Sequence, residues 1–311
     1  MKKNVLKIVG LAVLLTFSNC TSDNRDNLIT STEASTNINS LKSNLQSFNK
    51  SFKYKSNPNL NLLGKKKWWQ TALQVAAIAT GDASGAAAGV WAVQGLAGAV
   101  GAATAGTGYA VVSGVAGVIG AAGGSYAAYC STGGHCRGTF NSVDPKGNSI
   151  IYDFPTRYDY LENFGTLHNS ALANIYLSDN SISESLWVQN NIPNINEIDY
   201  VELLNNSDYI DLKNDINTLT DDYKASNYDV DQLLNGYLTK GLINQNLKEI
   251  LSLYFNATLK AETFEDYKAI TDRYVVEIQN SNLEEREKES LLASFSVSIQ
   301  SYYYWLNLEV E

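Results

Sequence analysis

Histidine is scarce in this chain, so few residues could carry acid–base chemistry. The two histidines are His135 and His168. His168 lies at helical spacing from Phe164 and Leu172, which places it on the apolar face of a helix. We interpret it as a hydrogen-bonded core histidine; the alternative, a general base, lacks a recognisable nucleophile. No nucleophile elbow, phosphate loop, zinc-binding helix or dinucleotide fingerprint is present in the sequence. These patterns predict a protein that is not an enzyme.

Two cysteines could form a small covalent loop. Cys130 and Cys136 flank the run Ser-Thr-Gly-Gly-His. In an exported protein this spacing favours a disulfide bond. The alternative is a metal site that also uses His135, but three ligands without a fourth make a poor zinc cage. We therefore expect a disulfide, no metal and no cofactor.

The acidic clusters also have a structural interpretation. Asp221–Asp222 and the pair Asp229 and Asp231 do not match the spacing of a calcium loop, so we interpret them as helix termini and solvated faces. A further group is expected on the outer face of the first turns of a helix, where negative charge is favourable. Its members are Glu284, Glu285, Glu287 and Glu289.

The beginning of the chain has the pattern of an export signal. Lys2, Lys3 and Lys7 form a basic region, Val5–Phe17 forms a short apolar run, and Cys20 follows. Residues 1–19 resemble the signal of bacterial lipoproteins, in which cleavage occurs before a cysteine that then receives lipid; the relaxed box with Phe17 and Asn19 is typical of the Bacteroidetes phylum. This resemblance implies lipidation at Cys20, a membrane partner through the lipid, and a location at the outer membrane or cell surface. The alternative is an ordinary secretory signal with an incidental cysteine.

Residues 20–63 are rich in Asn, Ser, Thr and Lys and hold few large apolar residues. Such a composition cannot bury enough surface to fold alone, so we expect a disordered tether. Within it, residues 40–52 show some helical spacing and predict one short helix. The residues that carry this spacing are Leu41, Leu45, Phe48 and Phe52.

Residues 64–138 form a segment dominated by Gly and Ala. Between Asp82 and Arg137 no residue is charged, and small residues recur four apart. This spacing places them in a row on one side of a helix, where a second helix can approach to backbone contact, as helices do in lipid. We therefore predict a glycine-zipper hairpin that breaks near 101–108 and contacts a membrane or further copies of the chain. Its contact residues are Gly81, Gly85, Gly89, Gly98, Gly106, Gly114 and Gly117.

A basic and aromatic cluster lies at the beginning of this segment. Cations meet lipid phosphates, and indole rings favour the boundary between headgroups and acyl chains, so the cluster suits a membrane interface. The alternative is the N-terminal flank of a helix in a soluble bundle. The cluster consists of Lys65, Lys66, Lys67, Trp68 and Trp69.

Residues 150–311 predict an acidic bundle of several helices. Acidic residues outnumber basic ones here by more than two to one, which argues against nucleic acid as a partner. Thr263 and Ser281 each precede an acidic residue by three, as in capping boxes, and Asp229 could cap another helix. The one strand candidate is Ser149–Asp153. From about Phe154 onward the chain is expected to be helical, with helices over 161–175, 197–205, 209–225, 230–240, 244–259, 264–280 and 283–306, and the fold class is mainly α.

Two resemblances concern function. Trp68–Trp69 and the Gly/Ala run that follows are similar to the glycine-rich helical core of bacteriocins and glycine-zipper contact toxins, which insert into the envelope of a competing bacterium. Glu162–Asn169 and Leu292–Val297 resemble uncharacterised exported helical proteins of Bacteroidetes, which imply no activity. Together they imply an envelope lipoprotein that acts through membrane interaction or self-association, as a bacteriocin-like antibacterial factor. The alternative is a non-catalytic binding or scaffold lipoprotein with a buried Gly/Ala hairpin.

Overall fold

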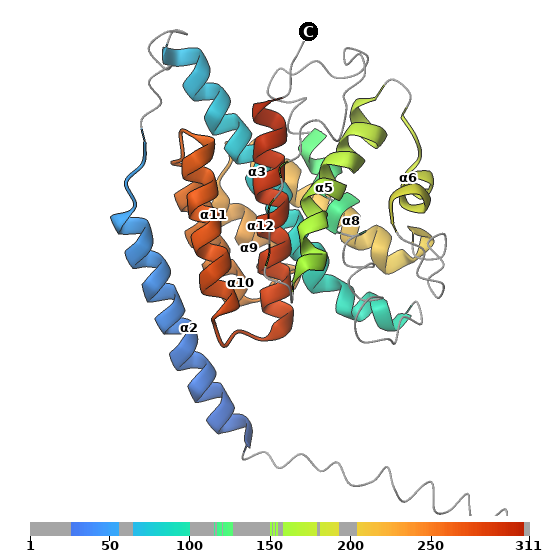
Figure 1. Ribbon diagram of the computed structural model, residues 1–311. Helices are drawn as coiled ribbons and strands as arrows, with labels where there is room; N and C mark the ends of the chain where they lie inside the picture. Colours follow the sequence, from blue (N-terminus) through green and yellow to red (C-terminus); the bar gives the residue numbers. More distant parts are fainter. Residues whose placement is uncertain are drawn as a thin grey trace, which may run out of the picture.

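The computed structural model describes the helical body of the chain (Figure 1). Every regular element among the described residues is helical, which confirms the mainly α fold class. Side chains are described in the first helix from residue 38 and in the second from 74 to 92. The described residues are 26–55, 65–99, 115, 117–119, 121–126, 150, 152, 154, 158–178, 181–192 and 204–307.

The helices predicted between residues 209 and 306 are confirmed, each within two residues at either end. Of the helix predicted at 197–205, the structure describes residues 204 and 205, and both are helical. In the strand candidate, the described residues Ile150 and Tyr152 do not belong to a strand. In chain order the elements are α2 (Asp26–Ser51), α3 (Lys65–Ala99), the 3₁₀ turn η2 (Asp159–Leu161), α5 (Glu162–Ala171), the π-helical turn η3 (Leu172–Leu177), α6 (Glu184–Asn191), α8 (Ser207–Ala225), α9 (Val230–Thr239), α10 (Gln245–Thr258), α11 (Phe264–Gln279) and α12 (Glu285–Leu306).

Two helices, α3 and α12, form the centre of the molecule and pack along each other. Every residue is buried from Val75 to Val90 in α3 and from Ser290 to Tyr302 in α12. A helix that is buried on all sides needs small side chains where another backbone approaches closely. The Gly and Ala residues of α3 and the Ser and Ala residues of α12 meet this need.

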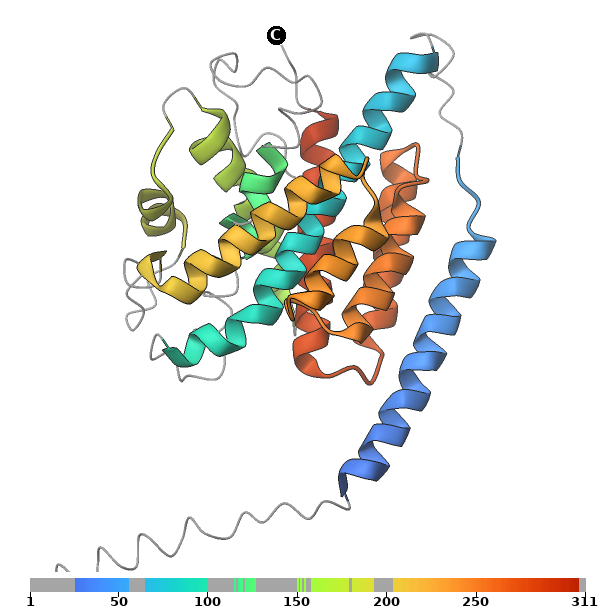
Figure 2. The same cartoon turned by 180° about the vertical axis from the view of Figure 1, so that it is seen from behind.

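The other helices surround this central pair. Helices α8, α9 and α10 contact α3, while α5, α10 and α11 contact α12. Seen from behind, α3 runs obliquely across the bundle beside α8 (Figure 2). The Gly/Ala segment and the acidic helices therefore contribute to one hydrophobic core in their described parts.

Helix α2 corrects the expectation of a disordered tether. Residues 26–51 are helical, and the second half of α2 lies against α10 and α11 at the side of the bundle (Figure 1). The spacing expected over 40–52 is confirmed, because Leu41 and Leu45 are buried. Asn49 Nδ2 also donates to the carbonyl oxygen of Leu253 at 3.0 Å. The composition of this part is too polar to fold alone, but its few apolar residues suffice when a neighbouring surface covers them.

The N-terminal caps follow the sequence signals in two of three cases. Thr263 Oγ1 accepts from the amide of Asp266 at 3.1 Å, and Asp229 Oδ1 accepts from the amide of Gln232 at 3.0 Å. The capping box predicted at Ser281 is wrong by one turn, because α12 is capped by Glu284 and Glu287.

Two of the four glutamates at the start of α12 do not lie on a solvated outer face. Glu287 is buried, and its Oε1 accepts from Asn244 Nδ2 at 2.6 Å and Asn246 Nδ2 at 2.8 Å. Half-buried Glu289 accepts from the hydroxyl of Tyr160. These carboxylates therefore join α12 to α10 and to η2.

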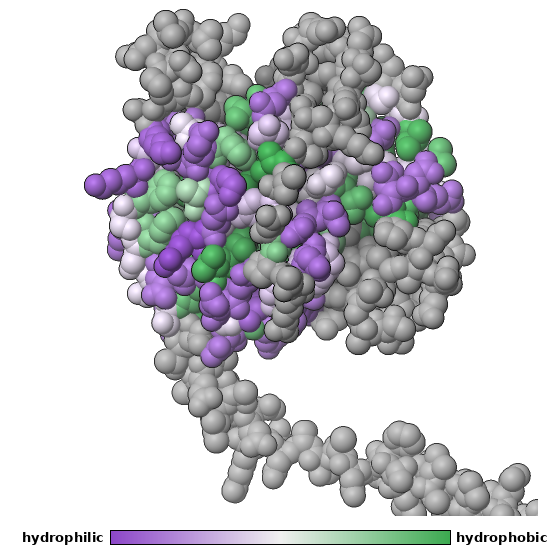
Figure 3. Space-filling view, viewed as in Figure 1, coloured by the Kyte–Doolittle hydropathy of each residue, from purple (hydrophilic) through white to green (hydrophobic). Residues whose placement is uncertain are grey.

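The outer surface is largely polar where Figure 3 displays described residues, with small apolar areas between hydrophilic side chains. Among the described residues, no helix has both the length and the apolar character that crossing a membrane requires.

Candidate functional site

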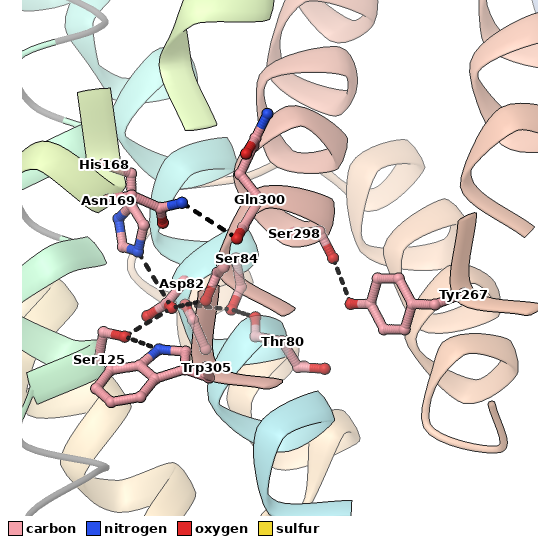
Figure 4. Close-up of polar contacts among 12 residues, drawn as sticks. Thr80, Asp82, Ser84, Ser125, His168, Asn169, Tyr267, Ser298, Gln300 and Trp305 are labelled. Atoms are coloured by element: carbon pink, nitrogen blue, oxygen red, sulfur yellow. Dashed lines mark hydrogen bonds and ion pairs between the residues drawn. The ribbon is translucent and has the colours of Figure 1, made fainter. Parts of the chain in front are cut away.

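A polar cluster lies at the centre of the fold, around the one acidic residue of α3 (Figure 4). The Asp82 side chain is 1 % exposed. Its Oδ2 atom accepts a hydrogen bond from Ser125 Oγ at 2.8 Å and another from Ser301 Oγ at 2.5 Å. Short hydroxyl–carboxylate distances are typical of charge-assisted bonds, which suits a negative charge on Asp82.

The direction of the Ser125 bond follows from its second partner. Trp305 Nε1 lies 2.9 Å from Ser125 Oγ, and an indole nitrogen can only donate. The hydroxyl of Ser125 therefore accepts from Trp305 and directs its own hydrogen to Asp82. This chain of donors joins α12, the segment 121–126 and α3.

His168 faces the same carboxylate oxygen from α5. Its Nε2 atom lies 3.3 Å from Asp82 Oδ2, within ion-pair distance but without hydrogen-bond alignment. The imidazole is 0 % exposed, which confirms that His168 is a core residue, but neither of its nitrogens makes a hydrogen bond with a described residue, so the expected hydrogen bonding is wrong. His168 Nδ1 and Asp82 Oδ1 have no hydrogen-bond partner among the described residues.

The cluster contains Ser, His and Asp but differs from a hydrolytic triad. In a triad the histidine bonds the nucleophilic hydroxyl and the carboxylate orients the histidine. Here Ser125 and Ser301 both donate directly to Asp82, and all three side chains are at most 1 % exposed. Neither hydroxyl has a histidine nitrogen as hydrogen-bond partner among the described residues, and the arrangement joins α3 to α12 and to the segment 121–126.

Buried hydroxyl groups continue around α3 from the neighbouring helices. Burial raises the pKa of Tyr223 on α8 and of Tyr237 on α9, and the negative charge of Asp82 adds to both effects. Within α3, Thr80 Oγ1 donates to the carbonyl oxygen of Ala76 at 2.9 Å, and Ser84 Oγ to that of Thr80 at 2.7 Å. The hydroxyls of α3 are therefore satisfied inside the helix.

The predicted contact glycines that the structure describes make close contacts inside the protein. A Cβ atom at Gly117 would lie 3.1 Å from the carbonyl oxygen of Ala86, and one at Gly85 would lie 3.4 Å from the Cα of Ala121. Gly81 is less crowded, because a Cβ there would meet nothing nearer than 3.8 Å. Gly89 is buried in the same helix. The row of small residues therefore brings α3 and the segment 115–126 into backbone contact.

Several sequence expectations lie outside the described residues. Cys20, Cys130, Cys136, Gly106 and Gly114 are among them. The structure describes the backbone of the predicted interface cluster, Lys65–Trp69, and of Gly98 as part of α3 but not their side-chain surroundings. Lipidation, the disulfide bond and the membrane interface remain predictions.

Asp82 is the functional candidate that the sequence interpretation missed. In the sequence it marks only the border of an uncharged stretch, yet it is the single acidic residue of a helix of 35 residues. A lone charge inside a neutral helix needs a partner when that helix is buried. The position of Asp82 as the lone charge of this helix is the sequence feature that could have identified it. No group of acidic, His or Cys side chains in the described part of the chain is arranged to hold a metal ion.

A scan against protein-family models, a search of curated proteins and a search of solved structures each give no match.

The cluster predicts different effects for two serines on the same helix. Ser301→Ala removes a donor to the buried carboxylate and should cost about 2 kcal/mol, the range for hydrogen bonds to charged groups. Ser290→Ala is the matched control, because Ser290 Oγ donates only to the carbonyl oxygen of Arg286, one turn earlier in α12, at 2.9 Å. That change should be nearly neutral. Urea unfolding of both variants measures the difference, and equal losses would contradict a special role for the Asp82 cluster.

Proposed function

We propose that this protein is a lipid-anchored envelope protein that acts by binding, with its Gly/Ala helix serving as the packing core of a water-exposed helical module. One observation carries the proposal: every residue from Val75 to Val90 of α3 is buried within the chain itself. The small-residue row thus already has its contact partners in α12, α8 and the segment 115–126. The module presents its outer, polar helices to any partner.

The lone charge in α3 favours a helix that stays inside the fold. Transfer of an ionised carboxylate to an apolar medium is costly unless the charge is paired and hydrogen-bonded. In the fold, Asp82 has two hydroxyl donors and an imidazole close to one oxygen. If α3 left its neighbours, Asp82 would lose both hydroxyl donors and the imidazole together. Binding through the outer surface leaves them intact and is therefore favoured over insertion of α3.

Vesicle binding by the mature chain with Cys20→Ser, which cannot be lipidated, tests the proposal. The expected result is a monodisperse monomer that neither floats with phosphatidylethanolamine–phosphatidylglycerol vesicles nor releases a trapped dye. Gly85→Leu should lower the stability of this monomer by about 2 kcal/mol or more, because the added side chain overpacks the core against Ile216 and Ala121. Dye release by the unlipidated chain would contradict the proposal.

The second candidate is membrane interaction or self-association through the Gly/Ala segment. The close approach of Gly117 to the backbone of Ala86 favours it, because small-residue contacts of this kind also join helices in lipid. It predicts dye release or oligomers that disappear in the double variant with Gly85→Leu and Gly89→Leu. If release or oligomer size is unchanged in that variant, this candidate is wrong.

A further inference from the structure

One segment lies on the outside of the bundle and covers a single face of it. The second half of α2 and the residues that follow it run along α10 and α11 at the edge of the molecule (Figure 1, Figure 2). We call residues 38–55 the strap and the surface that it covers the docking face. The helices beneath hold one another through their own rings: the Tyr254 and Phe295 centroids are 4.5 Å apart, and those of Tyr267 and Tyr302 are 4.1 Å apart.

The strap meets the docking face with one row of apolar side chains. The row follows the i, i+4, i+7 and i+11 spacing by which an amphipathic helix anchors on a partner protein. Leu41 and Leu45 are 4 % and 0 % exposed, and the Phe48 ring lies edge-on to that of Tyr274 with centroids 6.5 Å apart. The row consists of Leu41, Leu45, Phe48 and Phe52.

Hydrogen bonds to the main chain of α10 fix the register of the strap. Asn49 Nδ2 donates to the carbonyl oxygen of Leu253 at 3.0 Å. The hydroxyl of Tyr54 donates to the carbonyl oxygen of Ala257, one turn further along α10, also at 3.0 Å. The oxygen of Ala257 accepts from the amide of Lys260 as well, at 3.1 Å, so it keeps a partner without the strap.

The strap and the helices beneath it carry opposite charges. Residues 38–55 contain four lysines and no acidic residue, whereas acidic residues predominate after residue 150. Lys42 pairs with Glu249, and the amide of Lys55 donates to Asp266 Oδ2 at 2.6 Å. A partly exposed ion pair such as Lys42–Glu249 adds little stability, but complementary charge favours the encounter of this face with a basic helix.

We infer that the strap is a detachable occupant of the docking face, and that the vacated face binds the strap of a second copy of this chain. The second copy offers the same apolar row, the same lysines and the same Asn49, so it can make the same contacts. Exchange of an identical element between copies is a general route to association. In dilute solution each chain's own strap has the higher effective concentration, which keeps the face covered and the protein monomeric. The inference goes beyond the proposed binding function, because it adds a covered surface and the helix that fits it.

Hydrogen exchange of the mature, unlipidated chain tests the detachment. In the double variant with Leu41→Ala and Leu45→Ala, amides over 38–52 should exchange at least tenfold faster than in the wild type. The reason is the loss of two buried side chains, since Ala has a high helix propensity and does not weaken the helix itself. Amides over 290–302 of α12 should be unchanged.

A second double variant on the same helix is the matched control. Ser43→Ala with Ser47→Ala changes two exposed positions of α2 and should exchange over 38–52 as the wild type does. If the leucine variant leaves the exchange of the strap unchanged, or accelerates α12 equally, the strap is not a separable element and the inference is overturned.

A fluorescent peptide of residues 38–55 tests the docking face directly. It should bind the variant with Leu41→Ala and Leu45→Ala at least tenfold more tightly than the wild type, whose own strap covers the face. The same peptide with both leucines replaced by alanine is the control and should not bind. Binding of the first peptide to neither chain, or to both equally, contradicts the inference. Because no lipid is present in these measurements, their outcome is independent of whether the chain binds vesicles.

Discussion

Gly165→Ala is expected to prevent normal packing of α5, with a loss of at least about 3 kcal/mol in the free energy of unfolding, the upper range for overpacked cores. Helix α5 crosses α12 at this residue. A Cβ atom there would lie 2.3 Å from the carbonyl oxygen of Ser296 and 2.4 Å from Gln300 Cγ. The first neighbour is backbone and cannot rotate away, so one of the two helices must move.

Movement of α5 would also break polar contacts. The amide of Gly165 donates to Ser296 Oγ at 3.1 Å, and Ser296 Oγ donates to the carbonyl oxygen of Glu162 at 3.1 Å. Asn169, one turn further along α5, donates to the carbonyl oxygen of Gln300 at 3.2 Å. A shift of α5 large enough to admit a methyl group would strain all of these and would carry His168 away from Asp82.

The same substitution at Gly81 provides the control. A Cβ atom at Gly81 would meet the side chains of Thr220 and Tyr223 at 3.8 Å, an ordinary van der Waals distance. Because Gly is disfavoured in a helix interior, Gly81→Ala should raise the stability by about 0.5–1 kcal/mol. Chemical denaturation measures both variants. A loss at Gly81 as large as that at Gly165 would show that the close approach of α5 and α12 is not what requires glycine.

The second large effect is expected in alkaline solution. Burial raises the pKa of Tyr254 to about 12, although its hydrogen bonds with Ser298 and Thr271 lower the pKa in part. Burial also raises the pKa of Tyr237 and of Tyr267. The ordinary pKa of a tyrosine side chain is 10.0, and the unfolded chain has tyrosines close to this value.

Because these pKa values are raised in the folded state, the stability decreases as the pH rises. Below pH 10 a buried tyrosine is protonated in both states, and its contribution to stability is fully present. Above pH 10 the unfolded chain loses protons that the folded chain retains, so the stability falls by about 1.4 kcal/mol per pH unit for each such tyrosine. Tyr254 alone accounts for a loss of about 2 kcal/mol by pH 12, and the other buried tyrosines add to it.

We therefore expect cooperative unfolding between pH 10 and pH 12. Circular dichroism measures the loss of helix, and near-ultraviolet absorbance measures the tyrosinate that appears with it. Tyr304→Phe is the control: its hydroxyl is buried without a hydrogen-bond partner among the described residues, so the variant should be no less stable at neutral pH and less sensitive to alkali. Titration of most tyrosines near pH 10 with the helices intact would contradict the buried placement.

The sequence predicts the helices of the acidic half well because their signals are local. The spacing of apolar residues and the caps at Asp229 and Thr263 are set by neighbouring residues in the chain. Ser281 misleads because its hydroxyl instead donates to the carbonyl oxygen of Ile278 at 2.6 Å and closes the preceding helix. Glu287 was expected on a solvated face, but it is buried because the fold brings Asn244 and Asn246 next to it.

The candidate site could be predicted only in part. The sequence identifies His168 as a core residue, but its partner Asp82 is 86 positions away and becomes relevant only when α3 enters the same core. The row of small residues predicts close helix contact without saying which helix makes it. In the described residues that contact is made within the chain, by the segment 115–126, as between Gly117 and Ala86. Long-range placement of this kind is not encoded in periodicity or spacing.

The central claim is that residues 75–90 of α3 form the water-excluded core of a stable monomer. Hydrogen exchange of the mature chain that carries Cys20→Ser and no other substitution, with and without lipid vesicles, tests it most directly. We expect the amides over 75–90 to be among the slowest to exchange, and we expect vesicles to leave their exchange rates unchanged. Exchange of these amides as fast as in an exposed helix, or a large change in their protection when vesicles are added, would contradict it.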